Sequence, residues 1–166
     1  MLNESEFKES IKSKYVTEYG ARIGEVFCHI FDRNMQIEAI DIFFEVAQKF
    51  DFFDSEKFDQ RYLLEANLID SRNAMISSII KEVKYDEHFM SWDEGSSFLD
   101  LFLREFNEIE KVYTNANWAK STSKNSYVNE LDMMGWSGFS KYCYYDYGFI
   151  IVTEKKIGIL WFGDES

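Results

Sequence analysis

The pattern of apolar residues changes once along this chain, near residue 114, and the change limits the folds that the chain can adopt. Before that point, apolar side chains recur every three to four residues, which is typical of amphipathic helices. After it, glycines separate runs of β-branched and aromatic residues, which is typical of strands. This order predicts an α+β fold, with N-terminal helices packed on a C-terminal, mainly antiparallel sheet. We expect a single domain over residues 1–166, mainly helical over 1–113 and mainly strands over 127–163.

Apolar stripes and candidate N-caps predict several helices in the first part of the chain. The first is expected over about 4–18, because Asn3 is a candidate N-cap and Phe7, Ile11 and Tyr15 recur at four-residue spacing. Similar stripes predict helices from Asp32 or Asn34 to Phe50, from Ser55 to Ile69, from Asp70 or Ser71 to Val83, and from Ser96 or Ser97 to Tyr113. Residues 21–31 fit both a helical face and strand alternation, and we favour a helix there.

Several strands are predicted in the last third of the chain. Apolar residues 149–153 and 157–162 flank the polar turn 154–156, which predicts an antiparallel hairpin. Residues 142–147 predict a third strand, and residues 127–133 predict a fourth. The polar stretch 114–126 is expected to be a loop.

The charge is strongly negative and unevenly distributed. The chain has 18 Lys and Arg residues and 30 Asp and Glu residues, which gives a net charge of −12. Residues 32–110 contain 8 basic and 19 acidic residues, so this block alone carries −11. Direct binding to nucleic acid is not expected, because phosphates are held by clustered Lys and Arg. The acidic block is interpreted either as a solvated face that maintains solubility or as a docking face for a cationic protein.

The compartment is predicted from the N-terminus and the cysteines. The first residues are polar and acidic, without the basic and apolar regions of a signal peptide. The longest apolar run, 149–152, is far shorter than the roughly 18 residues that span a membrane. We therefore expect a cytoplasmic protein with no membrane partner. In a reducing compartment, Cys28 and Cys143 are expected to be buried thiols without a disulfide bond.

Motifs that carry catalysis or bind metals are not recognised. The two histidines, His29 and His88, do not have zinc-site spacing, and the acidic clusters at 51–59 and 86–94 do not match a calcium-binding loop. The sequence Gly135-Trp136-Ser137-Gly138 does not match the nucleophile elbow of hydrolases. We therefore expect no catalytic residues, metal or cofactor, although a hydrolase that uses a pair of carboxylates stays open among so many acids.

Aromatic residues are concentrated after residue 135, and they have two interpretations. Either helices cover one face of a sheet whose other face carries tyrosines, or the aromatics form a binding surface, because Tyr and Trp dominate the energetics of protein interfaces. Two further tryptophans lie in predicted loops, one of them beside acidic residues. The candidate partner-binding residues are Asp86, Glu87, Trp92, Asp93, Glu94, Trp118, Trp136, Tyr142, Tyr144, Tyr145 and Asp146.

The acid-rich helical part, followed by the apolar tail Gly148 to Asp164, resembles immunity proteins of bacterial contact-dependent growth inhibition systems. The resemblance covers the general character of most of the chain and the pattern of its tail. It implies a cytoplasmic antidote that binds its cognate toxin domain, often a nuclease, and in some cases lets a toxin hairpin join its own sheet (β-augmentation). A short terminal sheet could supply the strand edge that this binding requires.

The expected function is therefore to neutralise a basic toxin domain by blocking its active site or substrate surface. The protein would carry out no chemistry itself. Two alternatives stay open: an acidic interaction or regulatory module without a toxin partner, and a carboxylate-dependent hydrolase.

Overall fold

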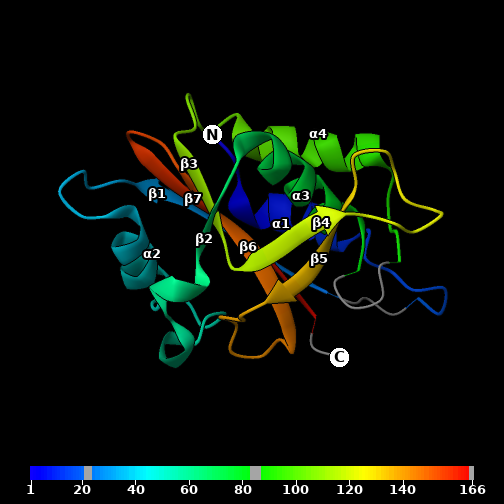
Figure 1. Ribbon diagram of the computed structural model, residues 1–166, viewed down its shortest axis with the longest axis horizontal. Helices are drawn as coiled ribbons and strands as arrows, with labels where there is room; N and C mark the ends of the chain where they lie inside the picture. The colour runs from blue at the N-terminus through cyan, green and yellow to red at the C-terminus, as the bar shows by residue number, and fades with distance from the viewer. Residues whose placement is uncertain (21–23, 83–86, 165–166) are drawn as a thin grey trace.

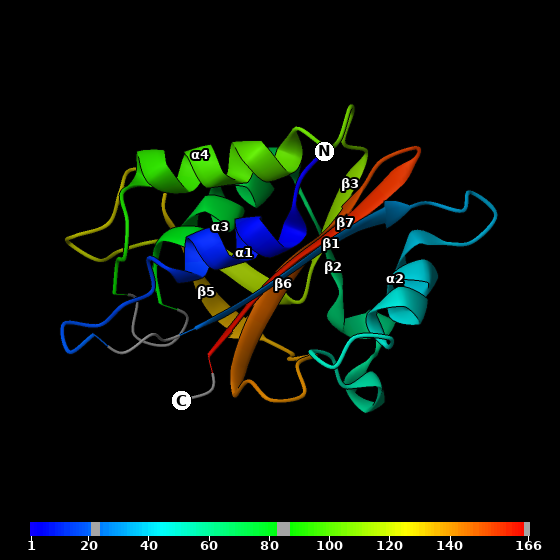
Figure 2. The same ribbon diagram turned by 180° about the vertical axis from the view of Figure 1, so that it is seen from behind.

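A five-stranded antiparallel sheet lies between two groups of helices, and a second sheet has two strands (Figures 1 and 2). The computed structural model describes residues 1–20, 24–82 and 87–164. In chain order the elements are α1 (Glu4–Lys12), β1 (Glu25–Asp32), α2 (Ala39–Ala47), the 3₁₀ turns Ser55–Lys57 and Gln60–Tyr62, β2 (Leu64–Ala66), α3 (Leu68–Ile80), α4 (Trp92–Leu103), β3 (Lys111–Thr114), β4 (Ala116–Lys120), β5 (Leu131–Trp136), β6 (Tyr145–Val152) and β7 (Lys156–Asp164). The predicted α+β class is confirmed.

The hairpin of β6 and β7 occupies the centre of the larger sheet, whose strand order is β1-β7-β6-β3-β2. Its pairing extends from Tyr145 opposite Asp164 to Val152 opposite Ile157, so the predicted hairpin is confirmed and is longer than expected. On its two sides, β7 pairs with β1 and β6 pairs with β3. The terminal hairpin is therefore central, with β3 pairing along residues 149–152 of β6, and the outer strands of this sheet are β1 and β2.

Both faces of the central hairpin are buried. On β6, Phe149 and Ile151 pack in a core with α1, α3 and α4, whereas Ile150 and Val152 pack in a second core with α2. Figure 2 shows α2 on one side of the sheet and the other three helices on the opposite side. Strands buried on both faces consist of nearly continuous apolar residues, which accounts for the unbroken apolar runs at 149–152 and 157–162. No face of this hairpin is left for a layer of exposed tyrosines.

Side-chain caps begin three of the helices. The Asn3 side chain accepts a hydrogen bond from the Glu6 N–H at 3.0 Å, as predicted, and Asn67 caps α3 in the same way. Helix α1 nevertheless ends at Lys12, so the expected helix over 4–18 is too long. Helices α2 and α3 confirm the helices expected before Phe50 and after Asp70, although their first and last residues differ from the predicted ones. The predicted helix end at Val83 lies outside the described residues.

Two of the predicted helices are wrong. Residues 25–31 of the segment 21–31, for which a helix was favoured, belong to β1, which pairs with β7 along its whole length. Residues 21–23 lie outside the described part of the chain. The helix expected over 55–69 is replaced by two 3₁₀ turns, β2 and the first residues of α3. Asp54 and Asp59 each accept a hydrogen bond from a backbone N–H two residues later, which stabilises these turns locally in place of a continuous helix.

Several boundaries in the second half also differ from expectation. Helix α4 begins at Trp92 instead of Ser96, because Ser91 and Glu94 form a capping box, and it ends at Leu103. Residues 111–114 are strand β3, and β4 lies in the stretch expected to be a loop. The strand expected over 127–133 begins only at Leu131, and the one expected over 142–147 is the start of β6. Three of the strands therefore come from or begin within the part expected to be mainly helical.

Helix α1 covers part of the outer edge of β1. The Glu4 carboxylate accepts a hydrogen bond from the Ile30 backbone N–H at 3.0 Å and lies 3.0 Å from His29 Nδ1. The Cys28 thiol also contacts the Glu4 carbonyl oxygen at 3.5 Å. One outward-facing N–H group of this edge strand is thus occupied within the chain.

Gly148 allows the indole of Trp161 to lie directly against the backbone of β6. The two residues are opposite each other in the β6–β7 pairing. A Cβ atom at position 148 would lie 2.2 Å from Trp161 Cδ2. Trp161 is fully buried, so it has no room to move away.

We expect Gly148→Ala to lower the free energy of unfolding by about 2–3 kcal/mol, because the added methyl group overpacks the core against Trp161. The matched control is Gly135→Ala on β5, where no atom lies within 4 Å of the added Cβ. The control should change stability by less than about 1 kcal/mol. Urea unfolding followed by tryptophan fluorescence measures both; equal effects of the two substitutions would contradict the close contact.

Candidate functional site

The predicted partner-binding residues do not form one continuous surface. One group lies at or just before the start of α4: Glu87, Trp92, Asp93 and Glu94. A second group lies where β5 ends and β6 begins: Trp136, Tyr144 and Tyr145. Tyr142 lies beside Asp51, whereas Trp118 and Asp146 pack inward. Asp86 lies outside the described residues. Two separate clusters therefore need to be considered.

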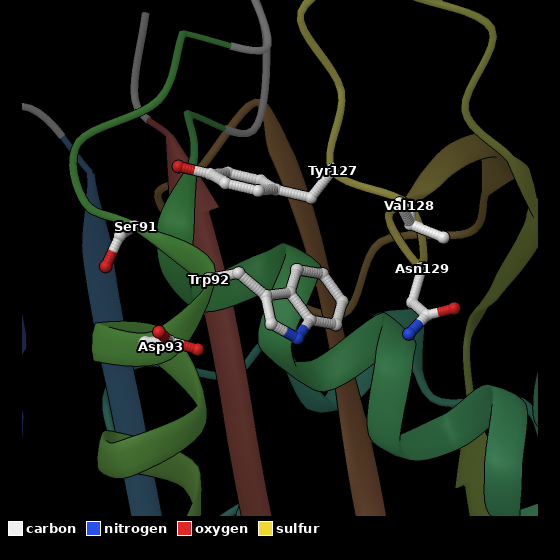
Figure 3. A pocket seen from close by; sticks show the side chains of 6 residues that line it. All are labelled: Ser91, Trp92, Asp93, Tyr127, Val128 and Asn129. Carbon is white, nitrogen blue, oxygen red and sulfur yellow. The ribbon is translucent and has the colours of Figure 1, made fainter.

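A pocket of about 320 Å³ opens between the start of α4 and the turn that precedes β5 (Figure 3). Its lining consists of Ser91, Trp92, Asp93, Tyr127, Val128 and Asn129. The ring centroids of Trp92 and Tyr127 are 6.1 Å apart, and the ring planes meet at 45°. In Figure 3 the Tyr127 ring lies above the Trp92 indole, and the Asn129 amide lies beside that indole. We call this site the Trp92–Tyr127 pocket.

The charged groups around this pocket are mainly acidic. Asp93 is exposed and makes no ion pair with any residue in the described ranges. Glu94 accepts a hydrogen bond from the Ser91 N–H, which lowers the pKa of its carboxyl group, and it lies 3.4 Å from Lys14 Nζ. Glu87 is also exposed. The described lining contains no Lys or Arg, so the pocket offers aromatic faces beside an unpaired carboxylate.

A buried charged cluster lies next to the pocket. Lys81 Nζ lies 3.1 Å from Glu130 Oε2 and 2.6 Å from Asp132 Oδ1, and it donates a hydrogen bond to the Leu131 carbonyl oxygen. The side chains of Lys81 and Glu130 are each 2% exposed. On its other oxygen, Glu130 contacts His88 Nε2 at 2.6 Å. The cluster joins the end of α3 to the start of β5.

This cluster holds the turn that carries Tyr127. The Glu130 N–H donates to the Tyr127 carbonyl oxygen at 3.1 Å, and the Tyr127 N–H contacts Glu130 Oε1 at 3.5 Å. The His88 ring packs edge-to-face on Tyr127, with centroids 5.4 Å apart. Sequence reasoning identified Trp92 and Asp93 but missed Tyr127, Asn129 and the cluster. No local pattern reveals these contacts, because Lys81 and Glu130 are 49 residues apart.

A second aromatic cluster lies at the other end of β5. The Trp136 and Tyr145 ring centroids are 5.0 Å apart, and those of Tyr144 and Tyr145 are 6.2 Å apart. Trp136 is 39% exposed and Tyr144 is 79% exposed. Met134, on the same strand, is 68% exposed. We call these four residues the Trp136 patch; they form an exposed apolar surface of the kind that marks interaction sites.

Asp146 is wrong as a contact residue. It is buried, and its Oδ2 atom accepts hydrogen bonds from the Phe139 N–H, the Ser140 N–H and Trp161 Nε1. Burial raises the pKa of its carboxyl group, and these hydrogen bonds oppose that rise. Asp146 therefore fastens the segment before β6 to the core and is not available to a partner.

Trp118 and Tyr142 also have intramolecular roles. The Trp118 ring stacks on Phe149 with centroids 5.6 Å apart, and its indole N–H donates to Thr114 Oγ1, so this side chain mainly anchors β4 to the core. Tyr142 is 59% exposed, and its hydroxyl group donates to Asp51 Oδ1 at 3.3 Å. Tyr142 thus remains accessible but lies beside the loop after α2.

The acidic block of residues 32–110 does not fold into one acidic face. Glu38 at the N-cap of α2, and Asp41 and Glu45 on the helix itself, are exposed and form no ion pair within the described chain. Helix α4, with Asp93 and Glu94, lies on the opposite side of the sheet from α2 (Figure 2). The single acidic docking face considered from the sequence is therefore wrong, and only the carboxylates near the start of α4 lie beside the Trp92–Tyr127 pocket.

Among the described residues, the cysteine thiols and possible metal ligands do not add a reactive group to either aromatic cluster. The two cysteines are buried and free, as predicted, and burial raises the pKa of the Cys28 thiol to about 12. Within residues 1–20, 24–82 and 87–164, no group of three or more His, Cys, Asp or Glu side chains is arranged to hold a metal ion.

We expect Asp146→Ala to destabilise the fold by about 3 kcal/mol, because it leaves buried N–H donors without an acceptor. Glu45→Ala on the exposed face of α2 is the control for loss of one carboxylate, and it should change stability by less than about 0.5 kcal/mol. Chemical unfolding at pH 7 measures both. A loss no greater than that of the control would show that Asp146 does not have this anchoring role.

Lys81→Met is expected to reduce stability by about 3–5 kcal/mol, since Glu130 and Asp132 would then lie close together without their shared cation. The control is Lys124→Met, which removes an exposed positive charge from the connection between β4 and β5. Thermal unfolding measured by circular dichroism compares the two variants. If both melt at the same temperature, the buried cluster contributes nothing to the fold.

Comparisons with known proteins do not assign this chain to a family. No family model matches the sequence, and no curated protein or solved structure gives a significant match. None of the helices described in the structure is both long enough and apolar enough to cross a membrane. The geometry and charge of the two clusters are therefore the basis for a functional proposal.

Proposed function

We propose that this protein is an antidote that binds a cationic toxin domain and blocks its active site or substrate surface. A nuclease domain is the toxin that we favour. The observation that carries the proposal is the pair of exposed aromatic clusters at the two ends of β5. One of them, the Trp92–Tyr127 pocket, includes the carboxylate of Asp93, which forms no ion pair with the described residues. Exposed Trp and Tyr side chains provide large contact areas at low entropic cost, which suits a binding surface.

The spacing of the two clusters suits one partner. Strand β5 has six residues, so its ends are about 17 Å apart at a rise of roughly 3.3 Å per residue. A stable interface buries about 800 Å² on each partner, which corresponds to a patch about 30 Å across. A single globular domain lying along β5 could therefore contact both the pocket and the Trp136 patch.

The charge of the whole molecule supports a basic partner. A net charge of −12 attracts cationic proteins over distances of about 10 Å in moderate salt and raises the rate of encounter. The carboxylates of α2 contribute to this long-range field although they lie on the other side of the sheet. Nuclease domains carry basic surfaces because they must hold phosphates, so they suit such a partner.

The resemblance to immunity proteins of contact-dependent growth inhibition systems supports a toxin as that partner. The same resemblance implies that the protein acts in the cytoplasm. Binding by strand addition to the larger sheet would have to use one of its outer strands, since the terminal hairpin is central. Strand β2 has three residues, and Glu4 occupies one N–H group on the edge of β1. The β4–β5 sheet also has an outer edge on each strand, but the aromatic side chains at the two ends of β5 provide the larger contact surface, and we therefore favour contact through side chains.

The test uses the protein encoded by the reading frame next to this chain's gene. That protein is expressed in a bacterial host with and without this chain, and growth and complex formation are measured. We expect arrested growth that co-expression restores, together with a stable complex in size-exclusion chromatography. A neighbouring product that is not toxic and does not bind would reject the antidote function in favour of a regulatory module.

With such a partner, Asp93→Lys should slow association several-fold at low salt, because it reverses a charge beside the pocket. Glu45→Lys on α2 makes the same charge change on the far side of the sheet and should have a smaller effect. Stopped-flow kinetics at two salt concentrations measures both rates. Equal slowing by the two variants would indicate that only the net charge matters and would remove Asp93 from the interface.

A further inference from the structure

We propose that the Trp92–Tyr127 pocket is a receptor for an arginine side chain of the partner. This inference rests on the proposed function for the identity of the partner, and it adds the chemical group that the pocket recognises. It depends on three features of the pocket: the two rings, the charge around them and the rigidity of the turn that carries Tyr127.

The rings are placed to contact one cation together. Both rings line the pocket, their centroids are 6.1 Å apart, and their planes meet at 45°. A cation in the pocket that approaches both rings lies within the roughly 6 Å of each centroid at which cation–π attraction is significant. Trp gives the strongest such interaction, and a planar guanidinium group can also stack on it.

The charge at the pocket favours a cation over an anion. Asp93 provides a full negative charge that no described cation neutralises, and none of the lining residues is basic. The start of α4 would attract an anion through its free N–H groups, but Ser91 and Glu94 form a capping box there. The acidic first turn therefore already satisfies the helix dipole, and a second anion would meet the carboxylates of Asp93 and Glu94.

The remaining lining residues suit the arginine stem and head group. Val128 is 85% exposed and provides an apolar wall for the methylene groups of an arginine. Figure 3 shows the Asn129 amide beside the Trp92 indole, with its nitrogen toward the indole; a half-turn of the amide group would place its oxygen there as an acceptor for a guanidinium N–H group. A volume of about 320 Å³ accommodates a whole side chain rather than a single ion.

The pocket is held in shape before any ligand arrives. Glu130, fixed by Lys81 and His88, anchors the turn of residues 127–130 through its backbone and side-chain contacts with Tyr127. Trp92 is held by the capped first turn of α4. Because both rings are already ordered, binding does not require the ordering of the loop that usually weakens surface recognition.

The test is a titration of the ¹⁵N-labelled full chain with acetyl-Gly-Arg-Gly-amide at low salt, followed by NMR. The control peptide has citrulline in place of arginine, which keeps the shape and removes the charge. We expect saturable shifts of the Trp92 indole and the Asn129 side-chain amide with the arginine peptide alone. Asp93→Asn should weaken binding about two- to fivefold, and Trp92→Leu should weaken it by a similar factor. Glu45→Gln on α2 should leave the affinity unchanged.

Equal binding of the citrulline peptide, or equal weakening by Asp93→Asn and Glu45→Gln, would overturn the proposal. The titration contains no toxin, so its outcome is separate from that of the growth experiment. Arginine binding without any growth rescue would keep the receptor pocket and reject the antidote function. Growth rescue that persists in the Asp93→Asn and Trp92→Leu variants, without peptide binding, would reject the pocket and keep the antidote function.

Discussion

The burial of β6 and β7 on both faces is the constraint on which the rest of the fold depends. Alternate residues of these strands belong to two different cores, so neither the α1–α3–α4 group nor the α2 side can form without them. The absence of a side chain at Gly148 leaves room for the Trp161 indole over β6 on the α2 side. The same Trp161 donates to Asp146, which fixes the chain before β6. The aromatic surface at Trp136 and Tyr145 is thus placed by the same buried strands.

The sequence predicted the parts of the fold that local interactions determine. The Asn3 cap, the apolar stripes of α2 and α3, and the β6–β7 hairpin each depend on residues close in the chain. Strands β1 and β2 could not be predicted in this way, because β1 is stabilised by pairing with β7, about 130 residues later, and β2 has only three residues. Residues 25–32 have apolar positions compatible with either structure, and only the long-range partner decides between them.

The candidate site shows the same division. Trp92 and Asp93 were found because an aromatic residue beside acids is visible in sequence. Tyr127 and Asn129 were missed because they reach the pocket through a turn held by a lysine 49 residues away from Glu130. Asp93 and Asp146 are the same residue type, and burial distinguishes them. The Asp93 carboxylate is exposed and forms no ion pair within the described residues, whereas the Asp146 carboxylate accepts hydrogen bonds from three donors in the core. The amino-acid sequence alone does not show which of the two aspartates is buried.

The contact of Glu4 with the Ile30 N–H has a consequence for how molecules of this protein meet one another. A bare outer strand is a template on which a second copy can extend the sheet, and repeated extension leads to fibrils. Here a carboxylate occupies the hydrogen-bonding position that an incoming strand would need, and it places negative charge where an equally acidic copy would approach. The start of the first helix thus makes this edge of the sheet less available for pairing with a second copy of the chain.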